Sequence, residues 1–337
     1  MTLISNGRTE FDVVTYVGNG STQSISGLLF SPGLVWIKAR SSATSHAIYD
    51  FVRGAEARLQ SNSTTAESAS DNGITSFDSN GFTLGANSDV NANGVTYVAW
   101  CWDAGSSTVT NTDGSITSSV RANASAGFSI VTYTGTGTTA TVGHGLGVAP
   151  SLILCKNRNG ATPWAVYHRS IGRNGYLLLN TTDAAVNLAG YWGTSEPSST
   201  VVSFDNGGYG GNNSNGLTYL MYCFAPVDGY SAFGSYTGNG SADGPFVYTG
   251  FRPRWVLLKN TSQTADWVVV DAARLGYNAA NSLLFPDGTS IEAPGDYMDL
   301  LSNGFKILSS LGEFNQNTSQ YIYAAFAESP FNFSRAR

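Results

Sequence analysis

The chain consists of short apolar segments separated by glycine turns, and the same series of segments occurs three times. Each copy opens with a segment of aromatic and β-branched residues, at residues 11–16, 128–133 and 230–236. A Gly-x-Gly turn follows each time, at residues 18–20, 135–137 and 238–240. Such segments, bounded by glycine turns, predict β-strands. The repeated order therefore predicts three copies of one β-domain.

The interior of each copy contains an unbroken apolar run between a proline and a lysine six positions later. The pairs are Pro32 and Lys38, Pro150 and Lys156, and Pro253 and Lys259. An apolar run that begins at a proline predicts a buried strand. A tight turn then precedes an aromatic residue, at residues 79–82, 206–209 and 302–305. Asn-Gly in these turns favours a hairpin because both residues tolerate positive φ.

Each copy closes on an aromatic-rich segment, at residues 96–102, 218–224 and 320–326. In the first copy this segment is aromatic on both faces, which indicates a central strand. We therefore predict an all-β fold of three tandem antiparallel β-sandwich-like repeats. The predicted repeats are residues 1–103, 127–226 and 227–337. Residues 104–126, rich in Ser, Thr and Asn, are predicted to form a linker or an excursion.

Composition agrees with an all-β chain. Charged residues make up 12% of the sequence, which is about half the share of an average soluble domain. Only residues 55–69 are expected to form a turn or two of helix. The net charge of −6 argues against a nucleic-acid partner, which would require a clustered basic stripe. No segment is long and apolar enough to predict membrane insertion, and the N-terminus does not resemble a secretory signal.

The cysteines predict no disulfide. Cys101 and Cys223 occupy equivalent positions in two copies, and Ala325 occupies that position in the third. Cysteines in separate domain cores do not meet, so we interpret them as small buried apolar residues. This pattern is typical of a chain assembled in a reducing cytosol.

The histidines do not indicate a metal site. His46, His144 and His168 lack the spacing of metal ligands. His168 occupies the position of Asp50 and Asp271 in the other copies, so any chemistry there would depend on one copy alone. We expect neither a metal nor another cofactor.

Two charged pairs recur at an offset of three, Asp50 with Arg53 and Asp271 with Arg274. We predict that they are structural ion pairs that fix a turn between strands. A glycosidase would need two carboxylates facing one cleft, and the sequence offers no partner for either aspartate. We therefore expect no catalytic residues and no enzymatic activity.

The middle copy contains an insertion at residues 188–197 that places Tyr191 and Trp192 in a loop rich in Gly, Ser and Pro. These two residues are the candidate ligand-binding residues, as a platform for sugar stacking or a protein contact. The alternative, which we favour, is a loop that folds its own aromatic side chains against a neighbouring domain.

Several segments together resemble a repeat domain of virion proteins from marine tailed phages, described as tail fibre or structural proteins. The resemblance is carried by residues 11–20, 27–38, 49–54, 76–85 and 96–102. The second copy loses the Asp-x-x-Arg element, and the third loses the Trp-Cys-Trp ending. The resemblance implies a virion component and brings no catalytic residues with it.

We therefore expect a non-enzymatic phage virion structural protein, assembled in the host cytoplasm. The leading hypothesis is a tail fibre or receptor-binding appendage that recognises a host surface glycan or protein. A capsid decoration or head fibre protein is the alternative, because a tail fibre is expected to carry an N-terminal anchoring segment and only a short segment precedes the first strand. A glycan-degrading tail spike is the second alternative. Other virion proteins are the expected partners, and a homotrimer and a pseudo-threefold monomer both stay open. Recognition is expected where the copies differ, in loops and in residues 104–126 and 188–197.

Overall fold

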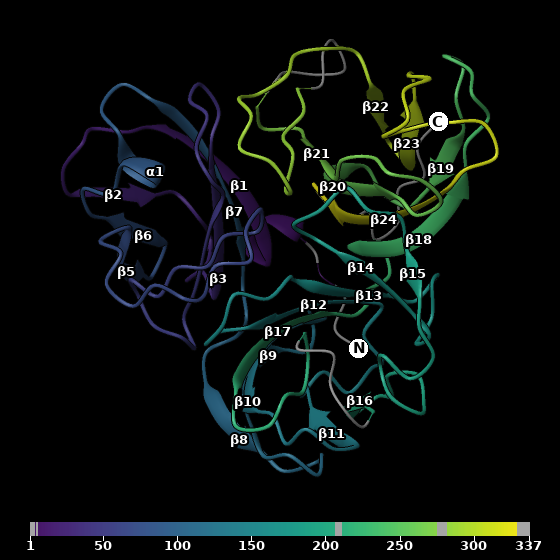
Figure 1. Cartoon of the computed structure of the whole chain (residues 1–337). Coiled ribbons are helices and arrows are strands. Elements are labelled where there is room, and N and C mark those ends of the chain that lie inside the picture. Colours follow the sequence, from purple (N-terminus) through teal and green to yellow (C-terminus); the bar gives the residue numbers. More distant parts are fainter. Residues whose placement is uncertain (1–3, 5, 206–210, 275–281, 329–337) are drawn as a thin grey trace.

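The computed structural model describes residues 4, 6–205, 211–274 and 282–328. Nearly all regular secondary structure in these residues is antiparallel β-strand, so the predicted all-β fold is confirmed. Figure 1 shows three lobes, one from each repeat, placed around a common centre. The turn predicted at residues 206–209 lies outside the described residues.

Repeat 1 is a sandwich of a four-stranded sheet, in the order β1-β7-β3-β4, and a three-stranded sheet, in the order β2-β6-β5. Its strands are β1 (Phe11–Val17), β2 (Gln23–Ser26), β3 (Leu34–Ala39), β4 (Ala47–Asp50), β5 (Ile74–Asp78), β6 (Gly81–Leu84) and β7 (Thr96–Trp102). Two short helices accompany them, η1 (Gly7–Thr9) and α1 (Ser88–Asn91). The closing segment β7 is central, between β1 and β3. The helix expected at residues 55–69 does not form: the segment makes turns and isolated bridges, because its backbone bonds to β4 and across its own bend.

Repeat 2 keeps this arrangement and extends its main sheet at both edges, in the order β15-β14-β13-β12-β17-β10-β9-β8. Its strands are β8 (Thr108–Asn111), β9 (Ser118–Asn123), β10 (Phe128–Thr134), β11 (Ala140–Gly143), β12 (Leu152–Asn157), β13 (Ala165–His168), β14 (Gly175–Leu178), β15 (Val186–Asn187), β16 (Val201–Phe204) and β17 (Thr218–Phe224). The second sheet pairs β11 with β16. Residues 104–126 thus contain a hairpin that adds two strands to the edge at β10.

Repeat 3 has the strand order of repeat 1, with a main sheet β18-β24-β20-β21 and a second sheet β19-β23-β22. Its strands are β18 (Ser231–Thr237), β19 (Phe246–Tyr248), β20 (Pro253–Asn260), β21 (Val268–Asp271), β22 (Met298–Leu301), β23 (Gly304–Ile307) and β24 (Gln320–Ala327). Every main sheet therefore places the closing strand between the opening strand and the strand of the unbroken apolar run.

The two central strands of each main sheet are buried on both faces. In β7, Tyr97, Ala99 and Cys101 point into the sandwich of repeat 1. The alternate residues Val98, Trp100 and Trp102 point the other way, into a core shared by all three repeats. A strand covered on both sides has no polar face, and this explains the unbroken apolar runs in the sequence.

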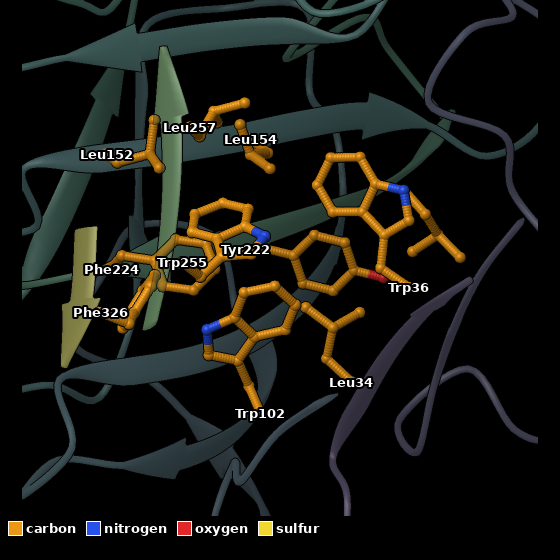
Figure 2. A pocket seen from close by; sticks show the side chains of 11 residues that line it. Leu34, Trp36, Trp102, Leu152, Leu154, Tyr222, Phe224, Trp255, Leu257 and Phe326 are labelled. Atoms are coloured by element: carbon orange, nitrogen blue, oxygen red, sulfur yellow. The ribbon is translucent and has the colours of Figure 1, made fainter. Parts of the chain in front are cut away.

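The shared core contains equivalent aromatic residues from the three closing strands. Ring centroids lie 6.0 Å apart for Trp102 and Phe224, 5.7 Å for Trp102 and Phe326, and 5.9 Å for Phe224 and Phe326. This near-equilateral triangle marks a pseudo-threefold axis through the chain. Figure 2 shows the apolar side chains around it; the cavity they enclose is only about 10 Å³, room for about one water.

The three cysteines are free and buried. Cys101 lies in the sandwich core of repeat 1, and Cys155 and Cys223 lie in that of repeat 2. Burial raises the pKa of the Cys155 thiol to about 12, so these thiols are neutral packing groups.

Candidate functional site

The predicted ion pair of Asp50 and Arg53 forms at the junction between repeats 1 and 2. Arg53 Nε donates to Asp50 Oδ2 at 2.5 Å, and both side chains are fully buried. The Tyr222 hydroxyl of repeat 2 donates to the same carboxylate oxygen at 2.7 Å. The pair therefore fixes its own turn and also anchors the closing strand of the next repeat.

The equivalent pair of repeat 3 anchors repeat 1. Arg274 Nε donates to Asp271 Oδ2 at 2.6 Å. The same oxygen accepts a hydrogen bond of 2.9 Å from Nε1 of Trp100, which occupies in β7 the position of Tyr222 in β17. The C-terminal repeat is thus joined to the N-terminal one, and the three repeats close into a ring.

His168 makes the third junction, between repeats 2 and 3. Its Nε2 lies 3.2 Å from the Tyr323 carbonyl oxygen, and its Nδ1 accepts from the Ser170 backbone N–H at 3.1 Å. At the position of Trp100 in β7 and Tyr222 in β17, β24 has Ala324, whose side chain has no hydrogen-bond donor for a carboxylate. A buried aspartate would lack the aromatic partner present at the other junctions, so a neutral imidazole fits instead. Burial lowers the pKa of His168 to about 4.

Three buried lysines reach from each repeat into the preceding one. Lys38, Lys156 and Lys259 each donate to a carbonyl of the adjacent residue and to a threonine carbonyl of the neighbouring repeat. Those threonines are Thr289, Thr64 and Thr182, at 3.2, 3.1 and 3.0 Å. Burial lowers the pKa of each lysine to about 8. The segments that receive these bonds, residues 60–67, 178–185 and 285–292, are called the straps below.

The straps also accept a ring N–H from the residue directly before β13, β21 and β4, the strands that follow the lysine strands. Trp164 Nε1 donates to Gln60 O at 2.8 Å, Trp267 Nε1 donates to Leu178 O at 2.9 Å, and His46 Nε2 lies 2.9 Å from Phe285 O. His46 Nδ1 accepts from the Trp36 indole at 2.8 Å, so the proton of the neutral ring sits on Nε2. One set of contacts is therefore repeated three times around the ring.

Sequence analysis missed a buried asparagine in each repeat, Asn91, Asn213 and Asn315. Each side-chain oxygen accepts the backbone N–H of the middle residue of the Gly-x-Gly turn, at Asn19, Thr136 and Asn239. The signal was available, since each asparagine lies six positions before the first tyrosine of the closing segment. These residues fix the turn that ends each opening strand.

Tyr191 and Trp192 do not form an exposed platform. Both lie in the sandwich core of repeat 2, 4% and 0% exposed. Tyr191 stacks on Tyr176 with ring centroids 4.1 Å apart, and Trp192 packs edge-on against Tyr167. Residues 188–197 therefore fold their aromatic side chains inward, within their own repeat rather than against a neighbouring one.

Exposed aromatic side chains occur instead on β19 of repeat 3. Phe246 and Tyr248 are 45% and 68% exposed on one face of this strand. The register places Ser24 and Ser26 of β2 at the equivalent positions in repeat 1. Sequence analysis did not single out this pair, because a three-residue strand carries little pattern.

Among the described residues, no group of three or more His, Cys, Asp or Glu side chains could hold a metal ion. In the same part of the chain, no helix is long and apolar enough to cross a membrane.

No curated protein sequence matches the chain. A family model described as a domain of unknown function, DUF7483, matches residues 7–330. The match begins just before β1 and extends past β24, so it includes all three repeats and the ring they form. The chain belongs to the DUF7483 family.

Proposed function

We propose that this protein is a non-enzymatic structural component of a phage virion that acts as a tail fibre or receptor-binding appendage. The proposal rests on the structural role of Asp50, Asp271, His168 and the buried lysines at the junctions between repeats. Each of these chemically versatile side chains lies at a junction and holds two repeats together. Their role is therefore structural rather than catalytic.

The ring supports a role in display. Its shared core and three junctions hold the outer loops of each repeat in fixed positions, and those loops differ between the repeats. The resemblance to repeat domains of tailed-phage virion proteins points the same way. Several copies on one particle would convert a weak single contact with a host surface into firm attachment.

A capsid decoration or head fibre protein is the second candidate, and the pseudo-threefold axis favours it. Three similar sandwiches around one axis present similar surfaces at about 120° intervals, which suits a threefold or quasi-threefold position on a viral shell. A single chain could occupy such a position without forming a homotrimer.

Gold-labelled antibody against the protein, imaged on intact virions, separates these candidates. Label at the tail tip, together with inhibition of adsorption by the purified protein, is the result expected of the receptor-binding role. Label over the head favours the decoration role. Release of reducing sugars from host polysaccharide by the purified protein would overturn the non-enzymatic proposal and favour a glycan-degrading spike.

A further inference from the structure

Repeat 2 contains an open trough of about 380 Å³ on the face of its main sheet that points toward the other repeats. Its lining comes mainly from β8, β9, β10 and β17, with Thr117 just before β9 and Arg158 just after β12, and most of its residues carry hydroxyl groups. The hydroxyl side chains that matter below are Thr110, Thr117, Ser119, Thr132, Thr134 and Thr218. This volume lies within the usual range of small-ligand sites, roughly 300–1,000 Å³.

The trough is the polar continuation of the shared core. Along β10, Phe128 and Ile130 point into that core, and the next residues on the same face are Thr132 and Thr134. Exposure increases along the same face, since Phe128 and Ile130 are buried, Thr132 is half-buried and Thr134 is exposed. The face therefore has a buried half that joins repeats and an open half that faces solvent.

The hydroxyl groups are arranged in cross-strand rows. Thr110, Ser119 and Thr132 are direct neighbours on three adjacent strands, and Thr134 pairs with Thr218 in the next row. Neighbours in such a row lie about 5 Å apart. Within the described part of the chain, no side-chain hydrogen bond engages Thr110, Thr117, Ser119, Thr132 or Thr134.

Arg158 stands beside Thr218 at the side of the trough. Its Nε and Nη2 donate to Glu67 of the first strap at 2.9 and 2.7 Å. The paired carboxylate compensates the arginine charge, so the trough offers a positioned N–H donor rather than a site for an anion.

We propose that this trough binds a neutral oligosaccharide. The unengaged hydroxyls of Thr110, Ser119 and Thr132 can both donate and accept hydrogen bonds, as the hydroxyls of a sugar chain do. A nucleic acid would meet a chain of net charge −6. The proposal deepens the receptor-binding role and rests on it for the source of the sugar.

The trough exists only where residues 104–126 add β8 and β9 to the sheet. Thr15 of β1 and Ser235 of β18 occupy the register position of Thr132, but they lie on edge strands without such a hairpin. Both are exposed. They provide matched controls for a hydroxyl group on the same kind of strand.

The test is a titration of protein carrying ¹³C-labelled threonine methyl groups with maltohexaose, cellohexaose and agarohexaose, followed by NMR. We expect at least one hexasaccharide to shift the methyl signals of Thr132 and Thr218. The triple variant Thr110→Ala/Thr117→Ala/Thr134→Ala should raise the Kd at least about tenfold, the effect of one or two lost hydrogen bonds. The double variant Thr15→Ala/Ser235→Ala should leave the Kd unchanged.

A second variant, Ser119→Trp, fills the trough and should abolish the shifts while the melting temperature stays within a few degrees. The proposal is overturned if no hexasaccharide shifts these signals at about 10 mM, the weak end of specific binding. It is also overturned if the shifts occur at Thr249, beside Phe246 and Tyr248, because the sugar would then bind the aromatic pair. Label over the head with intact sugar binding would overturn only the receptor-binding role; tail label without sugar binding would overturn only the trough.

Discussion

Acid should weaken the junction between repeats 2 and 3 through His168. The imidazole of His168 is buried and neutral. Its Nδ1 accepts from the Ser170 backbone N–H, and its Nε2 faces the Tyr323 carbonyl oxygen. Protonation on Nδ1 would replace an acceptor with a donor that points at an N–H and would place a charge in the core. The folded protein therefore resists protonation of His168.

The magnitude follows from the pKa. The pKa of His168 is about 4 in the folded protein, against about 6.5 in an unfolded chain. Between these pH values the unfolded state binds more protons, so stability is present above pH 6.5 and is lost as the pH falls toward 4. The difference corresponds to about 3 kcal/mol of unfolding free energy.

The assay is urea denaturation at pH 7.5 and pH 4.0 for the wild type and His168→Gln. Glutamine retains a donor for the Tyr323 carbonyl and does not titrate. The unfolding free energy of the variant should therefore fall between pH 7.5 and pH 4.0 by about 3 kcal/mol less than that of the wild type. Other titrating groups cancel in this difference. Equal losses of stability in the two proteins would contradict this prediction, because His168 would then be protonated as easily in the folded state as in the unfolded state. Thr15→Ala, remote from the junction, should behave as the wild type.

Three further predictions address the other contacts. Tyr222→Phe removes the hydroxyl that donates to Asp50 and should lower the unfolding free energy by about 1–3 kcal/mol in urea denaturation. Tyr248→Phe, at an exposed ring, should lower it by less than about 0.5 kcal/mol. Equal losses in the two variants would contradict the role given to the junction. Asn213→Ala leaves the Thr136 N–H and the Thr138 carbonyl without their partner and should lower stability by about 2 kcal/mol, with amide exchange at Thr136 as the local readout. Trp192→Ala should lose about 3–5 kcal/mol because its ring is in the core; a folded variant that retains full stability would indicate that the ring is exposed.

Much of the fold could be predicted from pattern. The unbroken apolar runs and the Gly-x-Gly turns located β3, β7 and their counterparts, because a strand buried on both faces must be apolar throughout. The ion pairs of Asp50 and Asp271 could be predicted from their offset of three. What they contact could not be predicted, since Tyr222 and Trp100 lie far from them in sequence.

The candidate binding surfaces were harder to predict. Tyr191 and Trp192 stand in a loop rich in Gly, Ser and Pro, and such loops are usually exposed. Their burial depends on space between the sheets of repeat 2, which no local pattern reports. Phe246 and Tyr248 on β19 were missed because aromatic residues at alternate positions of a short strand are equally consistent with a buried core.

The order of residues along the chain was enough to predict an all-β fold, a unit that occurs three times, and one order of strands and turns in each copy. Those features are local, since they depend on the period of apolar residues and on glycines and asparagines at turns. The shared core and the closure of the three units into a ring became evident from the three-dimensional arrangement alone. The outward faces of β3, β7 and their counterparts are apolar, and three such faces are covered only when they meet around one axis. That closure assigned Asp50, His168 and Asp271 to the three junctions and left the hydroxyl half of repeat 2 open to solvent.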